Sequence, residues 1–279
     1  VSEAAATLAL GMACALLAAA LWLNVATWMG MPVSTTHSIV GAVAGFGVVS
    51  AGWAAVNWAK MGQLVASWFI SPVVGGLAAF LLFKLISFFI LGREKPLKAA
   101  KRYAPLIVFF TFVVVSLAIF YKGLKNIIAS AEWLNGEVAF IMSIAFGVVA
   151  AFIAREVIRR RLEDADHRPL RDQLESVERL FAPLVIITSC CVAFAHGAND
   201  VANAVGPLAA VAEILKSGAI KMEVAVPFWI LALGGGGITL GLAMFGYRVM
   251  LTVGEKITQI TPSRGVAADL AATMTVLTC

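Results

Sequence analysis

The sequence of 279 residues is 61% hydrophobic and only 13% charged, which excludes an ordinary soluble domain, where about a quarter of the residues are charged. A soluble globule of this length could not bury so much apolar surface, and the mean hydropathy of +0.93 predicts a protein embedded in a lipid bilayer. The net charge of +5 comes from basic residues in short loops between apolar segments, so it does not indicate a nucleic-acid partner.

A series of membrane spans follows from the apolar segments, because a spanning helix needs about 20 apolar residues. The first span is interrupted by Gly30-Met31-Pro32 before a shorter apolar piece begins near Ile39. Trp53 and Trp58 lie in a loop typical of a membrane interface. Spans or apolar pieces are predicted at residues 4–29, 39–50, 63–91, 104–120, 138–154, 180–191, 224–247 and from 266 onward.

Two polar segments set the predicted orientation. Residues 92–103 form a basic loop, and residues 155–179 form a solvated, helical connector that carries three consecutive arginines. Two spans separate these segments, so both lie on the same side, and the positive-inside rule places them in the cytoplasm. A plasma or inner membrane location is therefore expected.

The fold class predicted is an all-α membrane protein, a polytopic helical bundle with inverted repeats and discontinuous, re-entrant or broken helices. A weak internal repeat aligns Leu270-Ala271-Ala272 with Leu17-Ala18-Ala19. It predicts one repeat with its following spans at residues 1–154, the connector at 155–179 and the second repeat at 180–279. The chain begins at Val1 and ends inside an apolar run, so we expect a fragment without the start of the first repeat and the end of the second.

The segment 193–207 places polar groups inside an apolar stretch, where ionisable residues usually mark a substrate or ion path. Asn199, Asp200 and Asn203 share one helical face, and their oxygens suit a hard cation. Gly197 and Gly206 would let the backbone unwind or approach a ligand, and Pro207 is expected to break the helix. A packing interface in which these groups hydrogen-bond across helices is the alternative.

A second polar stretch follows Pro32. Ser34, Thr35 and Thr36, with Ser38, would stand at the start of a half-helix, where free amides and the helix dipole bind anions such as phosphate. Simple N-capping by Ser34 or Thr35 is the alternative, although a cap needs only one hydroxyl.

Supporting roles are considered for His37 and His196, as proton carriers or site ligands, and for Asp269, as an intramembrane or an interfacial acid. The two histidines lack the matched spacing of a metal site, so no metal is expected beyond a transported cation. The cysteines lie in apolar runs and are interpreted as small hydrophobes. No P-loop pattern occurs, which disfavours ATP-driven transport.

These motifs resemble the signatures of the inorganic phosphate transporter (PiT) family. The segment 195–204 is similar to the family's Asn-Asp signature in its second repeat, and Pro32-Val33-Ser34-Thr35-Thr36-His37 is similar to the hydroxyl signature in its first repeat. Pro262-Ser263-Arg264-Gly265, followed by Asp269, is similar to a segment between the second repeat's signatures, where some members have Glu. The family carries both signatures in each inverted repeat, so one of each is expected to be lost at the two ends.

The resemblance implies a secondary active transporter and not an enzyme. It implies symport of inorganic phosphate with sodium or protons, no cofactor, and partners limited to phosphate, the coupling cation and the lipid bilayer. Phosphate would contact Ser34, Thr35, Thr36, Asn199 and Asp200, and the cation would contact Asn199, Asp200 and Asn203. Sulfate or another tetrahedral oxyanion is the alternative substrate. The oligomeric state stays open, a homodimer included.

Overall fold

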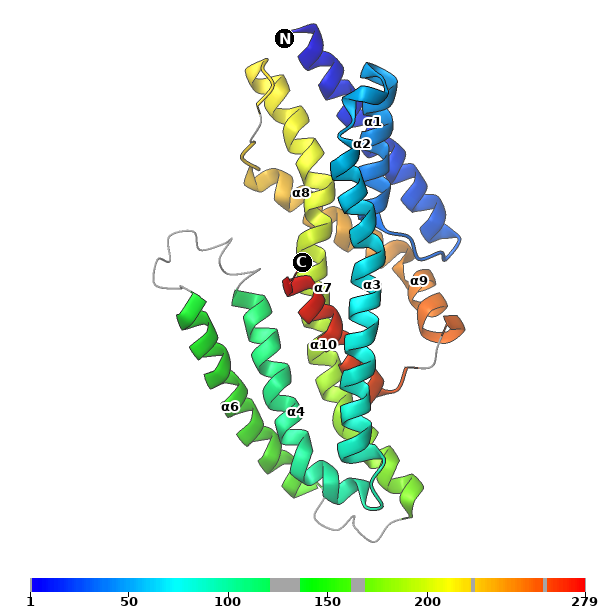
Figure 1. The fold of residues 1–279 in the computed structure, drawn as a ribbon. Coiled ribbons are helices and arrows are strands. Elements are labelled where there is room, and N and C mark those ends of the chain that lie inside the picture. Colours follow the sequence, from blue (N-terminus) through cyan, green and yellow to red (C-terminus); the bar gives the residue numbers. More distant parts are fainter. Residues whose placement is uncertain (1, 121–135, 162–168, 222–223, 258–259, 279) are drawn as a thin grey trace. The chain divides into compact units, whose positions relative to one another are not determined.

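The computed structural model describes residues 2–120, 136–161, 169–221, 224–257 and 260–278, and the regular structure within these ranges is entirely helical. Figure 1 shows helices of very different lengths. The α-helices are α1 (Glu3–Trp28), α2 (Thr35–Ala51), α3 (Trp58–Ile86), α4 (Pro96–Ala118), α6 (Gly136–Arg161), α7 (Leu170–Ser217), α8 (Phe228–Gly241), α9 (Tyr247–Leu251) and α10 (Pro262–Thr278). Shorter turns of other helix types are η1 (Trp53–Ala55), η2 (Ser87–Leu91), η4 (Leu242–Gly246) and η5 (Thr252–Ile257).

Six helices of the described chain are long and apolar enough to cross a bilayer. Most of their residues are exposed, and large apolar side chains such as Phe69, Val73 and Phe152 face outward. A soluble protein would not present such surfaces to water, whereas lipid accommodates them. The prediction of a polytopic helical membrane protein is confirmed. The spanning candidates are Glu3–Trp28, Trp58–Leu91, Pro96–Ala118, Gly136–Arg160, Leu170–Ser217 and Phe228–Gly254.

The break between α1 and α2 is encoded locally. Gly30 has a φ of 72°, and the amide of Met31 donates to the carbonyl of Ala26 at 2.8 Å. This is a Schellman ending, in which a glycine in the left-handed region lets the last helical carbonyls find donors. Ser34 then opens α2, because its side-chain oxygen accepts from the amide of His37 at 3.3 Å. The two helices run side by side in Figure 1, so the predicted discontinuous element is present.

Arg248, in α9, contacts the C-terminal end of α1 next to this break. Its Nη1 donates to the carbonyl of Trp28 at 2.7 Å, and its guanidinium lies 5.9 Å from the centroid of the Trp28 ring. A cation at a helix C-terminus interacts favourably with the helix dipole and with unpaired carbonyls. The end of α1 is therefore held by a charged side chain more than 200 residues away along the chain.

The first polar segment is more helical than predicted, and the second was already expected to be helical. The loop predicted at residues 92–103 is shorter, because α4 begins at Pro96, whose fixed φ suits the first helical turn. The predicted connector at residues 155–179 divides between α6 and α7. Its middle, residues 162–168, lies outside the described residues.

Helix α7 corrects a further prediction. Pro207 was expected to break the helix, yet α7 continues through it, and through Gly197 and Gly206, over 48 residues. Proline removes one backbone donor, and a helix between packed neighbours can absorb that loss. The backbone around Asp200 is therefore helical, and its contacts with other elements are made by side chains.

The described chain forms two compact units. Unit 1 comprises Val1–Val65 and Gly197–Gln259, and unit 2 comprises Ala66–His196 and Ile260–Cys279. Each unit combines two separate stretches of sequence, so this division differs from the predicted order of repeat, connector and repeat. That predicted order concerns internal symmetry and stays a prediction.

Each unit has its own core. In unit 1, buried residues of α1, α7 and α8 meet in two small clusters, formed by Ala5, Ala9 and Ile214 and by Val205, Ala209 and Ile230. In unit 2, α4 packs closely along α6, as Figure 1 shows. Its larger core joins residues of α3, α4, α7 and α10, including Ile86, Leu97, Val177, Phe181 and Val266.

Candidate functional site

The hydroxyl stretch and the Asn-Asp stretch meet within unit 1. Thr35, the first residue of α2, donates its hydroxyl proton to Oδ1 of Asp200 on α7 at 2.8 Å. Both side chains are half-buried. A hydrogen bond to a charged acceptor is stronger than one between neutral groups, so this contact fixes the start of α2 against the carboxylate.

A second contact lies further along both helices. The Nδ2 of Asn203 donates to the Thr36 hydroxyl oxygen at 2.8 Å. Because Asn203 uses a lone pair of that oxygen, the hydroxyl proton of Thr36 remains available to donate elsewhere. The structure thus pairs two hydroxyls of α2 with two polar side chains of α7.

The other hydroxyls of the stretch serve α2 itself. Ser34 caps the helix through its side-chain oxygen, as the simpler interpretation of the sequence allowed, and its own proton can still be donated. Ser38 donates to the carbonyl of Ser34 at 2.7 Å, so its hydroxyl is committed to the backbone. Ser34 and Thr36 can therefore still donate to an anion, whereas Thr35 could do so only by giving up its hydrogen bond to Asp200.

The predicted cation ligands are only partly brought together. Asp200 and Asn203 both face the start of α2, whereas Asn199 is exposed and has no side-chain hydrogen bond among the described residues. His37 is also exposed. His196, likewise exposed, belongs to unit 2 and is the last residue before the boundary between the units.

Asp269 forms a separate polar cluster in unit 2. Its Oδ2 accepts from the hydroxyl of Thr188 at 2.8 Å and from that of Ser189 at 2.6 Å. Thr188 is buried, so Asp269 lies against the surface of α7, and its role as an intramembrane or an interfacial acid stays a prediction. The sequence analysis missed Thr188 and Ser189, although two adjacent hydroxyls in an apolar run were a usable signal.

Glu178 completes the attachment of α10 to α7. Its carboxylate accepts from the backbone amide of Ser263 at 2.8 Å and from the Ser263 hydroxyl at 2.7 Å. A carboxylate at a helix N-terminus satisfies free amides and complements the dipole. The segment that carries Asp269 is therefore fixed at its start.

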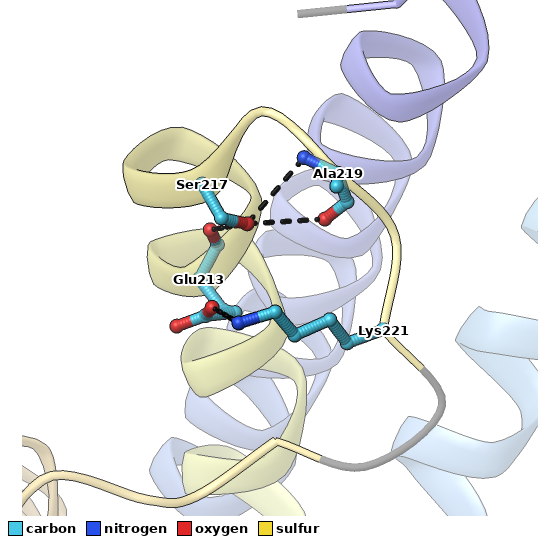
Figure 2. Close-up of polar contacts among 4 residues, drawn as sticks. All are labelled: Glu213, Ser217, Ala219 and Lys221. Carbon is cyan, nitrogen blue, oxygen red and sulfur yellow. Dashed lines mark hydrogen bonds and ion pairs between the residues drawn. The ribbon is translucent and has the colours of Figure 1, made fainter.

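The far end of α7 is closed by a set of local contacts, shown in Figure 2. Lys221 reaches back to form an ion pair with Glu213, and the hydroxyl of Ser217 donates to the carbonyl of Glu213 at 2.8 Å. Gly218, with a φ of 71°, donates its amide to the carbonyl of Ile214 at 2.8 Å. These contacts end the helix well beyond Pro207 and leave the backbone that carries Asn203 regular.

An open groove of about 560 Å³ lies beside Asn203 in unit 1. Its polar lining consists of Asn57, Lys60 and Asn203, and the remainder is apolar. Ser34, Thr35, Thr36 and Asp200 do not line it, so the hydroxyl–carboxylate contact is separate from this groove. Among the described residues, no group of three or more His, Cys, Asp or Glu side chains is placed to hold a metal.

Apolar spanning helices, an interrupted α1–α2 pair and a polar cluster between α2 and α7 define a multi-pass helical membrane protein with paired polar side chains between its helices. The sequence matches the Phosphate transporter family over residues 1–279, and the chain belongs to this family. The predicted family is thus confirmed. A family of transporters also agrees with the prediction that the chain is not an enzyme.

Individual relatives are similar along nearly the whole chain. The protein named "Putative phosphate permease TK2061" from Thermococcus kodakarensis is 44% identical over 267 residues, which cover 96% of this chain and 63% of the relative. "Inorganic phosphate transporter 2-1, chloroplastic" from Arabidopsis thaliana is 40% identical over 293 residues, covering 96% of this chain and 48% of the relative.

A solved structure agrees with the fold. The structure named "The sodium-dependent phosphate transporter" matches with a TM-score of 0.82 and 40% identity, over 98% of this chain and 65% of the solved chain. The present chain thus spans less than two thirds of the length of these relatives.

Proposed function

We propose that the protein carries inorganic phosphate across the cell membrane by symport with a cation, and that the cation is sodium. The family and the names of its relatives support phosphate as the substrate. The similar solved structure is that of a sodium-dependent transporter, which supports sodium over a proton. The observation that carries the proposal is the contact between the hydroxyls of α2 and the Asn-Asp face of α7.

The N-terminus of α2 is the proposed anion site. Ser34, Thr35 and Thr36 each carry a hydroxyl at the first turn, where unpaired backbone amides and the positive end of the helix dipole favour an anion. Neutral hydroxyls add hydrogen bonds without a permanent positive charge, so the anion can also be released. Asn199 is proposed to donate from the neighbouring face of α7, where its side chain is exposed.

Asp200 is the proposed link between anion and cation. Phosphate carries a charge of about −1.5 to −2 near neutral pH, and its approach to an ionised carboxylate is unfavourable without compensation. A sodium ion bound by Asp200, with Asn199 and Asn203 as further oxygen ligands, would supply that compensation.

The hydrogen bond from Thr35 gives this coupling a physical route. Thr35 has one hydroxyl proton, and in this structure that proton is donated to Asp200. When sodium occupies the carboxylate oxygens, the hydroxyl can turn to a phosphate oxygen. Sodium thus raises phosphate affinity by removing repulsion and by releasing a donor, and the effect is reciprocal.

Transport also requires the site to open to each side in turn. Two inverted repeats that rock against one another would provide this movement, with the segment at residues 155–179 on the cytoplasmic side. Asp269, His37 and His196 would take supporting roles in this cycle.

Substitution of Asp200 by Asn tests the assignment. Asn keeps an oxygen that accepts from Thr35 but removes the charge, so we expect sodium-dependent uptake of labelled phosphate to fall by about 100-fold or more. Uptake is measured in proteoliposomes that contain the whole protein, with sodium replaced by choline as the reference. Uptake of Asp200→Asn at the wild-type rate would contradict the proposal.

A matched control removes a charge elsewhere on α7. Glu213→Gln loses the ion pair with Lys221 at the helix end, and uptake should stay within about twofold of wild type because exposed pairs contribute little.

The identity of the substrate is tested by adding unlabelled sulfate in excess to the uptake assay with labelled phosphate. Sulfate could accept from the same hydroxyl donors, so full competition would favour a general oxyanion carrier, and uptake unaffected by sulfate would favour a phosphate-specific carrier.

A further inference from the structure

An open basic pocket lies at the turn between η2 and α4 in unit 2, apart from the proposed phosphate site in unit 1. Its volume is about 530 Å³, and it lies where the span Trp58–Leu91 ends and the span Pro96–Ala118 begins. The lining residues are Gly92, Arg93, Glu94, Lys95, Lys98, Ala99, Arg102 and Tyr103.

The charge of this pocket is uncompensated. Four basic side chains face one acidic side chain, all five are exposed, and the four basic residues make no ion pair within the described ranges. Arg93 lies 5.0 Å from the ring centroid of Phe88, and Arg102 lies 5.4 Å from that of Tyr103. Basic side chains that stack on aromatic rings keep their charge available to an anion.

The start of α4 adds to the positive field. Lys95 is the N-cap and provides no side-chain hydrogen bond to the helix, and the first turn has no acidic residue. Helix N-termini normally carry acceptors or acidic residues, because free amides and the dipole are positive there. Lys95 and Lys98 lie in this turn instead, so their positive charges add to the positive end of the helix dipole.

The floor of the pocket is rigid, and its border is apolar. Ile90 and Leu97 are fully buried in the unit 2 core, which fixes the backbone on both sides of the turn. Phe88 is 62% exposed and Leu106 is 53% exposed, so apolar side chains stand beside the basic ones. An occupant that satisfies both surfaces has an anionic head and apolar chains.

We propose that this pocket binds the headgroup of an anionic phospholipid from the adjoining leaflet. The phosphate of the lipid is held by Arg93, Lys98 and Arg102, and its acyl chains lie along Phe88 and Leu106. Basic pockets at the ends of spanning helices bind anionic headgroups in this way. A free anion would satisfy the charge but would leave the apolar border unexplained.

The test compares lipid binding by the whole purified protein and by two double variants. The pocket variant is Lys98→Gln with Arg102→Gln. The control variant is Arg159→Gln with Arg160→Gln, which removes the same charge from exposed residues of α6 that pair with Glu156. Binding of phosphatidylglycerol and of phosphatidylcholine is measured by titration into detergent micelles and by retention in native mass spectrometry.

We expect the wild type and the control variant to retain phosphatidylglycerol in preference to phosphatidylcholine, and the pocket variant to bind phosphatidylglycerol at least about tenfold more weakly. Equal losses in both variants would show general attraction to the surface and would overturn the proposal, as would no loss in the pocket variant. Thermal unfolding without added lipid verifies that both variants fold. If the pocket variant fails this check, Lys98→Gln alone decides between the same outcomes.

Competition distinguishes a lipid from a free anion. Inorganic phosphate should displace bound phosphatidylglycerol no better than chloride at the same ionic strength, because screening alone then acts. Specific displacement by inorganic phosphate would overturn the lipid assignment and indicate a site for the free anion.

Discussion

The hydroxyl of Thr35 has a single proton, and two acceptors of the proposed cycle compete for it. In the structure the acceptor is Asp200, at 2.8 Å, and in the proposed loaded state it is a phosphate oxygen. The neighbouring Thr36 differs, because its oxygen accepts from Asn203 and its proton is not needed by α7. The two threonines therefore have different expected roles, although they are adjacent and chemically identical.

Replacement of Thr35 by Val tests its role as a donor, with Thr35→Ser as the conservative partner. Val has nearly the shape of Thr but no hydroxyl, so a hydrogen bond to a charged oxygen is lost and the KM for phosphate at saturating sodium should rise by about 10- to 100-fold. Thr35→Ser keeps the donor and should stay within about threefold of wild type.

Ser38→Ala provides the control for this pair. Its hydroxyl donates to the carbonyl of Ser34, so its removal should leave the KM for phosphate unchanged. An unchanged KM in Thr35→Val, with normal folding, would assign Thr35 a purely structural role.

At the scale of elements, the interruption between α1 and α2 decides where the hydroxyls stand. Gly30 ends one helix, Ser34 begins the next, and Arg248 holds the carbonyl of Trp28 beside this break. If α1 continued without a break, the hydroxyls would lie on the side of a helix and not at its first turn. The proposed anion site therefore depends on a backbone feature that only a few residues encode.

Substitution of Gly30 by Ala should destabilise unit 1. Gly30 has a φ of 72°, which costs an L-residue about 1–2 kcal/mol, and a Cβ there would lie 3.2 Å from Oγ1 of Thr252. We expect a lower midpoint of thermal unfolding in detergent. Gly45→Ala, in the middle of α2 with open space around the added methyl group, should leave the midpoint unchanged or raise it. Equal midpoints for Gly30→Ala and wild type would contradict the structural role of this turn.

The sequence predicts local events of this kind well. Gly30, Pro32 and the hydroxyls after them mark a helix end and a helix start, and both are present. The same reasoning fails at Pro207, where α7 continues. A proline changes one hydrogen bond, and whether the helix breaks depends on neighbouring elements that a local pattern does not describe.

At the scale of the whole molecule, the proposed coupling predicts that sodium and phosphate stabilise the protein together. A ligand that binds only the folded state raises its stability according to its affinity, and reciprocal coupling makes the second ligand bind more tightly. Phosphate should therefore raise the unfolding midpoint more in sodium than in choline of equal ionic strength. Asp200→Asn should remove this difference. Equal shifts in both salts would show that the two ligands bind independently.

The family resemblance implied that the two polar stretches contact one phosphate, but the individual residue pairs between them were beyond the sequence. Residue spacing placed Asp200 and Asn203 on one helical face and grouped Thr35 with Thr36, but it did not show that the two groups meet in pairs. The contact of Asp269 with Thr188 was missed for the same reason. Hydrogen bonds between residues this far apart follow from how helices pack, and a single sequence contains no direct signal of that packing.

The separation of Thr35 from Asp200 by 165 residues has a consequence for biogenesis. At a synthesis rate of about 5–20 residues per second, the ribosome needs on the order of ten to thirty seconds to deliver the carboxylate after the threonine. During that interval α1 and α2 enter the membrane without their later partner. The Schellman ending at Gly30 and the cap at Ser34 use only nearby atoms. The backbone groups at the end of α1 and the start of α2 can therefore form their hydrogen bonds before the later helices are synthesised.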